Sequence, residues 1–191
     1  MVTKLIFETA TEIHARSLLV LGGARSGKSR YAQRLAESCG RRPVLIATAE
    51  ARDLEMQERI ARHKAERGSL WDVVEEPFAL TETLRREGRE DRLLVVDCTT
   101  LWLSNLLLRG ESLDAASAEL ASGVVNLAGP VIFVSNEVGL GIVPDNSLAR
   151  AFRDAQGWLN QALAEACDAV VLVNAGLPVL LKPAPALKLR L

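Results

Sequence analysis

The sequence predicts an α/β fold with a mostly parallel central sheet. From Leu18 onward, short runs rich in β-branched residues alternate with helical patterns. These runs are almost continuously apolar, which is typical of strands that are covered on both faces. A glycine-rich turn with a phosphate-binding pattern directly follows the first run. At 191 residues and 20.7 kDa, the chain has the size of one domain.

Strands are expected where the short, β-branched apolar runs occur. The five main runs are 18–21, 44–48, 93–97, 131–135 and 169–173. A further short strand is expected over Asp72–Glu75. An edge hairpin or strand is expected around Val179–Leu189.

Helices are expected between these runs, and glycines mark three of their ends, at Gly40, Gly68 and Gly88. The expected helices cover 29–39, 53–67, 78–86, 101–108, 113–127 and 147–167. Residues 1–16 have a polar, weakly patterned sequence, so we expect them to form an N-terminal extension outside the sheet. Residues 17–191 are then a single P-loop nucleotide-binding catalytic domain.

The turn after the first strand matches the pattern G-x-x-x-x-G-K-[ST] of a phosphate-binding loop. Its residues are Gly22, Gly23, Ala24, Arg25, Ser26, Gly27, Lys28 and Ser29. Glycines let the backbone turn tightly and direct several N–H groups at one point, and the following helix adds its positive N-terminal end. We expect Lys28 to reach the β- and γ-phosphates and the Ser29 hydroxyl to bind Mg²⁺. The chain is therefore expected to bind a nucleoside triphosphate.

The run Leu93–Asp97 ends in a carboxylate, where P-loop proteins carry an acid that holds Mg²⁺. We therefore expect Asp97 to share the metal with Ser29. An apolar run that ends in Asp also occurs at ordinary turns, and Thr99 and Thr100 would suit that local role. The chain lacks the Asn-Lys-x-Asp motif that reads guanine in signalling GTPases, so that class is disfavoured.

The helix expected over 53–67 places Met56, Ile60 and His63 on one face, because these residues are four and three positions apart. His63 would then lie on the side turned toward the protein, next to Lys64 and Arg67. A packed histidine is one interpretation. A nucleophile is the other, because a neutral imidazole can attack a phosphoryl centre. The other histidine, His14, lies in the extension, where a surface role is expected.

Several motifs in order along the chain resemble one enzyme family. They are Gly-Gly-Ala-Arg-Ser-Gly-Lys-Ser at 22–29, Ile46–Ala49, the charged run from Glu55 to Trp71, Glu75–Pro77, Asp97–Trp102, Asn136–Pro144, Arg150–Asp154 and Asn160–Gln161. The chain resembles the bifunctional adenosylcobinamide kinase/adenosylcobinamide-phosphate guanylyltransferase family of cobalamin biosynthesis, from about Leu18 to Leu181. The phosphate-binding loop alone is generic, whereas its combination with the Asn-Glu-Val-Gly block is specific.

The resemblance implies two reactions on a RecA-like P-loop fold. A nucleotide, ATP or GTP, first phosphorylates the corrinoid substrate adenosylcobinamide, and GTP then donates GMP to the new phosphate. The resemblance assigns the covalent GMP intermediate to His63, which joins Lys28 as a catalytic residue. It maps further nucleotide contacts onto Ala47, Thr48, Ala49, Lys64, Ala65, Glu66, Arg67, Glu75 and Asp97. It also implies a homotrimer.

Composition sets the wider expectations. A net charge of −1 argues against a chain-wide nucleic-acid surface, and no apolar run approaches the length that spans a bilayer. The three scattered cysteines suit a reducing, cytoplasmic location.

Two other functions are compatible with the same motifs. One is a different P-loop small-molecule kinase in which His63 is merely packed, and the other is a RecA-type nucleotide-operated binding module.

Some features are open on sequence alone. The turn-rich segment Asn136–Pro144 suits a structural loop as well as a substrate or subunit contact, so Asn136 and Glu137 are not assigned to the site. Core packing is the default expectation for Trp71, Trp102 and Trp158, and Cys98 is expected to be a small buried residue.

Overall fold

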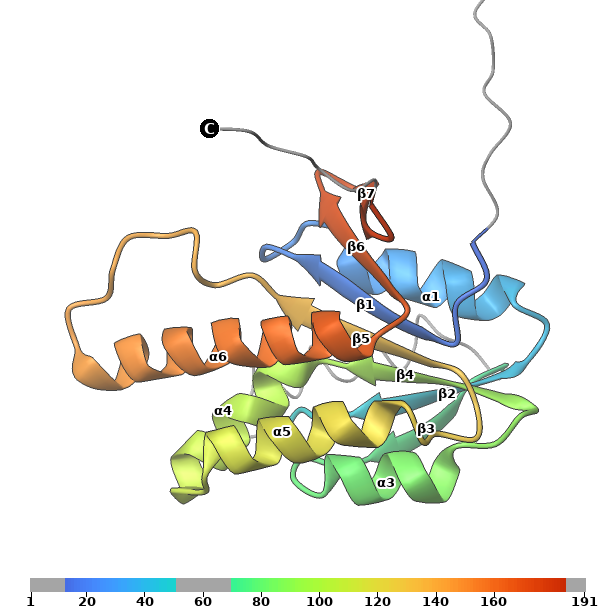
Figure 1. Ribbon diagram of the computed structural model, residues 1–191, viewed down its shortest axis with the longest axis horizontal. Coiled ribbons are helices and arrows are strands. Elements are labelled where there is room, and N and C mark those ends of the chain that lie inside the picture. Colours follow the sequence, from blue (N-terminus) through green and yellow to red (C-terminus); the bar gives the residue numbers. More distant parts are fainter. Residues whose placement is uncertain (1–12, 51–69, 185–191) are drawn as a thin grey trace, which may run out of the picture.

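A computed structural model describes residues 13–50 and 70–184, which form a sheet of seven strands between two helical layers (Figure 1). The strand order is β3-β2-β4-β5-β1-β6-β7, with parallel pairing between all neighbours except β6 and β7. The expected mostly parallel α/β sheet is therefore confirmed.

The strands match the apolar runs to within a few residues at each end. They are β1 (Ser17–Gly22), β2 (Arg42–Ala47), β3 (Asp72–Glu75), β4 (Arg92–Asp97), β5 (Val131–Asn136), β6 (Ala169–Asn174) and β7 (Leu177–Lys182). The expected edge strand near the C-terminus is β7, which pairs with β6 in an antiparallel hairpin. It ends at Lys182, earlier than the predicted limit at Leu189.

The described helices also agree in order with the sequence pattern. They are α1 (Lys28–Ser38), α3 (Leu80–Glu87), α4 (Thr99–Arg109), α5 (Leu113–Val124) and α6 (Ser147–Ala166). Ser112 and Asn146 cap α5 and α6, because each side-chain oxygen accepts a hydrogen bond from a backbone N–H in the first helical turn. The helix predicted over 53–67 and the extension before Ile13 lie outside the described residues.

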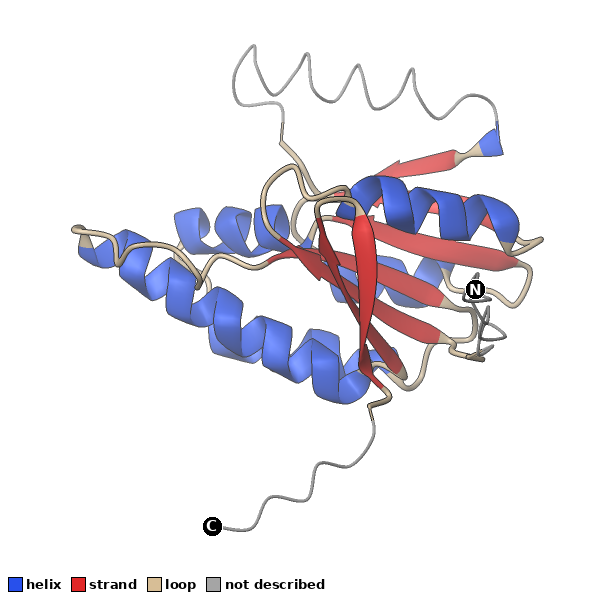
Figure 2. Ribbon diagram, turned by 90° about the horizontal axis from the view of Figure 1, so that it is seen from above, coloured by secondary structure: helices blue, strands red, loops and turns tan. Residues whose placement is uncertain are grey.

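Alternate residues of each strand pack on opposite faces of the sheet. On β1, Leu19 and Leu21 join a core with residues of α3, α4, α5 and α6, whereas Val20 packs with Ala32 and Ala36 of α1. Figure 2 shows the strands between these helices. The two cores explain why the apolar runs are continuous: neither face of the central strands meets water.

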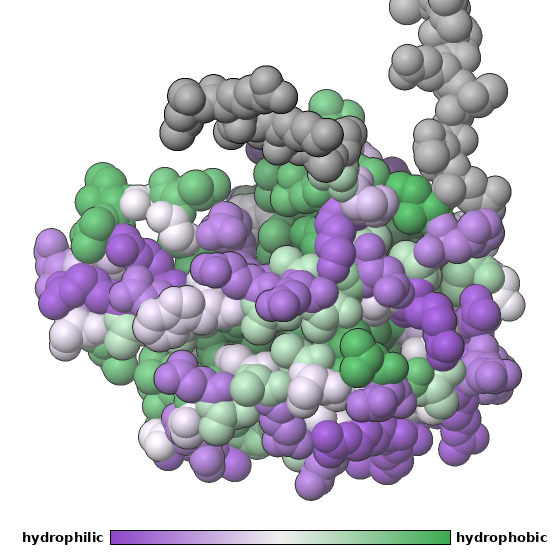
Figure 3. All heavy atoms as spheres, in the orientation of Figure 1, coloured by the Kyte–Doolittle hydropathy of each residue, from purple (hydrophilic) through white to green (hydrophobic). Residues whose placement is uncertain are grey.

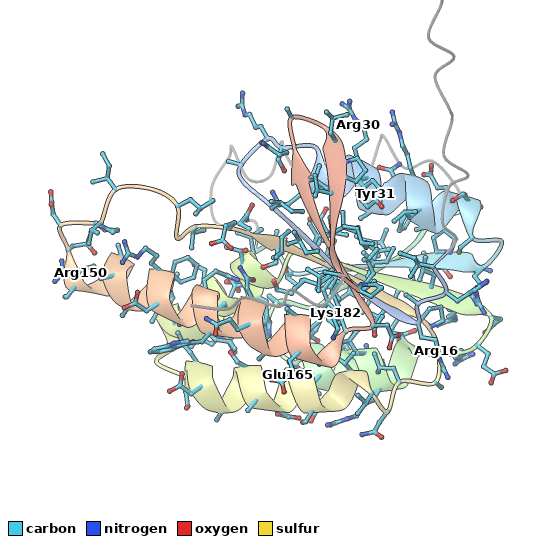
Figure 4. The ribbon with its side chains drawn as sticks, turned by 45° about the horizontal axis from the view of Figure 1, so that its top comes forward. Arg16, Arg30, Tyr31, Arg150, Glu165 and Lys182 are labelled. Carbon is cyan, nitrogen blue, oxygen red and sulfur yellow. The ribbon has the colours of Figure 1, made fainter. Side chains whose placement is uncertain are left out.

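The β6–β7 hairpin is fastened to the end of α6 by Lys182. Its Nζ donates hydrogen bonds to the backbone oxygens of Ala164, Glu165 and Cys167 at 3.0, 2.9 and 2.6 Å. Figure 4 shows Lys182 beside Glu165 at this helix end. A cation here also interacts favourably with the negative end of the helix dipole. The open end of the hairpin is thereby held against the C-terminal end of α6.

One expectation about the tryptophans is wrong. Trp71 and Trp102 are buried as expected, but Trp158 is 59% exposed. It lies two residues from both Gln156 and Asn160, which face the core, so it falls on the outer side of α6. Within the described residues, no helix has the length and apolarity needed to cross a bilayer.

The three cysteines differ in burial. Burial, with a smaller contribution from the charge of Asp97, raises the pKa of Cys98 to about 11. Burial raises the pKa of Cys167 to about 12. Cys39 is exposed, and all three cysteines are free. Because the thiolate is the nucleophile, the two buried thiols should be inert near neutral pH.

Iodoacetamide at pH 8 should therefore label the native protein at Cys39 alone. Peptide mass spectrometry before and after unfolding in guanidinium checks this, since all three cysteines should react once unfolded. Labelling of native Cys98 at the rate of Cys39 would contradict the burial described here.

Candidate nucleotide site

The glycine-rich loop connects β1 to α1 and contains two residues in the left-handed region of backbone space. Arg25 has a φ of 56° and Gly27 a φ of 97°. A Cβ atom on Gly27 would also lie 3.2 Å from the Cα of Gly176, in the β6–β7 turn. The Gly176 N–H donates to the Ser26 carbonyl at 2.8 Å, so the hairpin turn supports the loop from behind. Both conformation and space therefore require glycine at position 27.

The loop brings polar groups to one point. Lys28 is 8% exposed, and its Nζ donates to the Gly23 carbonyl at 3.1 Å, so its ammonium group lies across the loop. The buried Ser26 hydroxyl oxygen has no hydrogen-bond partner within the described part of the chain. A buried polar atom of this kind is costly unless a ligand or water satisfies it, and the oxygens of a phosphate can accept its hydrogen.

Ser29 and Asp97 meet at the mouth of the loop, although they are far apart in sequence. The Ser29 hydroxyl donates to Asp97 Oδ1 at 3.3 Å. In residues 13–50 and 70–184, no three His, Cys, Asp or Glu side chains gather as a metal site. Mg²⁺ beside a nucleotide needs fewer protein ligands, because phosphate oxygens and waters complete its shell. One hydroxyl and one carboxylate suit that requirement.

The sheet register aligns the other sequence-predicted residues. Ala47 pairs with Glu75 on β3 and with Asp97 on β4, so these three residues form a row across the carboxyl ends of adjacent strands. Ala49 follows this row and is half-buried, and Glu75 is exposed. Ligands of open α/β sheets bind at this edge. The structure thus brings the loop, segment 47–49, Glu75 and Asp97 to one side of the sheet.

Thr48 lies directly behind the row and is fully buried. Its hydroxyl donates to the Cys98 carbonyl at 2.7 Å and accepts from the Cys98 N–H at 3.0 Å. The peptide bond between Asp97 and Cys98 is cis. The Thr48 side chain is therefore occupied by hydrogen bonds within the protein.

The end of β5 belongs to this edge as well, although sequence reasoning did not assign it to the site. Asn136 pairs with Gly22 in the sheet, and its N–H donates to the Thr100 hydroxyl at 2.9 Å. The Asn160 side chain donates to the Asn136 carbonyl at 3.1 Å. A polar residue ending a buried strand was the available signal, and it is the same signal that identified Asp97.

A buried polar group from β5 and α6 supports that strand end. The Ser135 hydroxyl donates to Asn160 Oδ1 at 2.6 Å, and Gln156 Nε2 donates to the same oxygen at 2.9 Å and to Ser135 Oγ at 3.0 Å. Buried networks of this kind fix one arrangement, because each broken bond leaves a desolvated group. They hold the β5 end between the loop and Asp97.

Five predicted site residues lie outside the described residues: His63, Lys64, Ala65, Glu66 and Arg67. The described part of the site is therefore the part that would bind the phosphates and the metal. Chemically, this part can bind a triphosphate, neutralise its charge and position its terminal phosphates.

Comparisons with known proteins give one consistent answer. Residues 18–181 match the family model described as cobinamide kinase/cobinamide phosphate guanyltransferase. The chain is 52% identical, over 169 residues, to the bifunctional adenosylcobalamin biosynthesis protein CobP of Pseudomonas aeruginosa, covering 87% of this chain and 98% of that protein. It is 35% identical over 180 residues to CobU of Escherichia coli, with the same descriptive name, covering 86% and 99%.

Among solved structures, a crystal structure of the RadB recombinase superposes with a TM-score of 0.50 at 16% identity, covering 82% of this chain and 73% of that one. At this identity the likeness concerns the fold alone. It confirms the RecA-like P-loop architecture that the sequence predicted.

Lys28→Ala should weaken triphosphate binding and lower kcat/KM for nucleotide by about 100-fold, because a preorganised charge beside the phosphates is lost. Titration calorimetry with GTP measures the binding, and Arg30→Ala, an exposed residue of the same helix, is the matched control. Equal affinity of Lys28→Ala and the parent protein would contradict the loop's role.

Proposed function

The chain belongs to the cobinamide kinase/cobinamide phosphate guanyltransferase family, and we propose how its residues perform the two reactions of such an enzyme of cobalamin biosynthesis. The observation that carries the proposal is the convergence of the glycine-rich loop, Ser29 and Asp97 at one sheet edge. This arrangement holds a nucleotide by its phosphates.

In the kinase step, ATP or GTP lies with its phosphates in the loop. The aminopropanol hydroxyl of adenosylcobinamide attacks the γ-phosphorus, the bond to the β-phosphate bridging oxygen breaks, the nucleoside diphosphate leaves, and the hydroxyl proton passes to water. Lys28 and the N-terminal end of α1 stabilise the charge on the phosphate oxygens. Ser29 and Asp97 hold Mg²⁺, which supplies further charge neutralisation when it is bound. Positioning and electrostatics provide most of the catalysis in such a transfer.

In the guanylyl step, the neutral imidazole of His63 attacks the α-phosphorus of GTP. The bond to the β-phosphate oxygen breaks, pyrophosphate leaves, and GMP stays on the ring nitrogen. An oxygen of adenosylcobinamide phosphate then attacks the same phosphorus, which releases His63 and gives adenosylcobinamide-GDP. Lys64 and Arg67 offset the developing negative charge. In this proposal, the backbone of segment 47–49 and the residues Ala65, Glu66 and Glu75 contact the nucleotide, and the Thr48 side chain does not.

His63→Ala should retain the kinase reaction and lose guanylyl transfer, because only the second step needs the imidazole. GTP labelled at the α-phosphate, given without corrinoid, should leave covalent label on the parent protein at His63 and none on the variant. His14→Ala is the matched control and should label normally. A variant that retains both activities would contradict the nucleophile assignment.

We also propose that the enzyme works in the cytoplasm as a homotrimer. The three free cysteines support a reducing compartment. The loop between β5 and α6 carries Leu140 and Ile142 at 89% and 98% exposure, followed by the half-exposed Val143 and Leu148. Figure 3 shows this apolar surface at the outer end of the molecule. Apolar groups gathered on a surface in this way mark contact sites, so the loop is the candidate subunit contact.

Light scattering should give three times the chain mass for the parent protein. The double variant Leu140→Asp/Ile142→Asp should give a single chain, because the charges oppose burial of the loop. Leu177→Asp, an exposed apolar position on β7, is the control and should stay trimeric. A parent protein of single-chain mass would contradict the trimer, and a trimeric double variant would exclude this loop as the contact.

A further inference from the structure

We propose that Thr48 and Asn105 form a positioning pair that fixes the metal-side carboxylate Asp97 relative to the nucleotide segment 47–49. Neither side chain faces the nucleotide in this assignment. The inference rests on the proposed function, in that Asp97 is taken to hold the metal of a bound nucleotide. Four hydrogen bonds between segments distant in sequence carry it.

The first half of the pair is Thr48, the residue that follows β2. A hydroxyl has one hydrogen to donate, and Thr48 gives it to the Cys98 carbonyl while accepting the Cys98 N–H. Cys98 is thereby held through both of its backbone polar groups by one side chain. Since Asp97 immediately precedes Cys98, the bonds from Thr48 restrict where the Asp97 carboxylate can lie.

The second half is Asn105, which reaches the same place from α4. The residue is 5% exposed, and its Nδ2 donates to the Thr48 carbonyl at 2.8 Å and to the Pro77 carbonyl at 3.2 Å. Both amide hydrogens are therefore used on backbone oxygens. One bond fixes Thr48 itself, and the other fixes the turn that follows Glu75.

Together the two side chains join three strand ends, those of β2, β3 and β4. A fifth hydrogen bond, from the Glu76 N–H to the Ala47 carbonyl at 2.9 Å, joins the ends of β2 and β3 directly. The Ser29 hydroxyl lies 3.3 Å from Asp97 Oδ1, so a small shift of the β4 end would separate the two metal-side oxygens. Residues that orient metal ligands without touching the metal commonly affect its affinity by about 10–100-fold.

Loss of this positioning should weaken nucleotide binding only when Mg²⁺ is present. Loss of the Thr48 hydroxyl leaves the glycine-rich loop and Lys28 intact, so phosphate binding without metal should persist. What should be lost is the additional affinity that Mg²⁺ gives to the nucleotide. General damage to the fold would instead weaken binding in both conditions.

The test measures the Kd of a fluorescent GTP analogue (mant-GTP) in EDTA and in Mg²⁺, for the full chain. In Thr48→Val, which keeps the shape of threonine, the Mg²⁺-dependent gain in affinity should fall by about 10-fold while the Kd in EDTA stays within about twofold. Thr48→Ser, which restores the hydroxyl, should recover the gain. Thr83→Val is the matched control, because Thr83 is also fully buried but lies on α3.

Asn105→Leu, which removes the amide donors at similar size, should reduce the same gain. The double variant Thr48→Val/Asn105→Leu should lose no more than the worse single variant, since both act on one strand end. Losses that add in full would contradict a joint role. A Thr48→Val protein with an unchanged gain, or a Thr48→Ser protein that fails to recover it, would overturn the proposal.

The kinase and guanylyl activities of the parent protein are measured in parallel, which separates the two conclusions. A parent protein that lacks both activities yet loses its Mg²⁺ gain on Thr48→Val would contradict the proposed function while supporting the pair. An active parent protein whose gain is insensitive to Thr48 would contradict the pair alone.

Discussion

The close approach of the glycine-rich loop to the β6–β7 turn is the constraint on which the rest of the site depends. Gly27 has a φ of 97°, which favours glycine, and a Cβ on it would lie 3.2 Å from the Cα of Gly176. A Cβ on Gly22 would likewise lie 2.6 Å from the Val173 carbonyl oxygen. The missing side chains at Gly22 and Gly27 therefore let the loop pass close to β6 and the β6–β7 turn before α1 starts at Lys28. Lys28 and Ser29 are aimed at one point as a result.

The parallel sheet places further polar residues next to this loop. All strands from β3 to β6 end at the same edge, so Glu75, Ala47, Asp97 and Asn136 arrive beside the loop without any long connection. Side chains from α4 and α6 then fix the individual strand ends, through Asn105 on one side and Asn160 on the other. The helices thus contribute to the site by holding its backbone.

The sequence predicted most of the fold because buried parallel strands and glycine-terminated helices have strong local patterns. It placed the β2 run through position 48, whereas the strand ends at Ala47, and the Thr48 carbonyl accepts a hydrogen bond from the Asn105 side chain. The loop and Asp97 were predictable from motifs with fixed spacing. Thr48 and Asn105 were not predictable as supports, because their partners are backbone groups on distant segments. Trp158 was misplaced because apolar character alone does not say which face of a helix is covered.

The central claim is that Ser29 and Asp97 hold the metal of a nucleotide bound in the glycine-rich loop. Crystals grown with Mn²⁺ and a non-hydrolysable GTP analogue test it most directly, through the anomalous signal of the metal. The account predicts one manganese per chain, bonded to the Ser29 hydroxyl oxygen and to the nucleotide, and next to the Asp97 carboxylate. A nucleotide seated elsewhere, or a metal remote from both side chains, would contradict it.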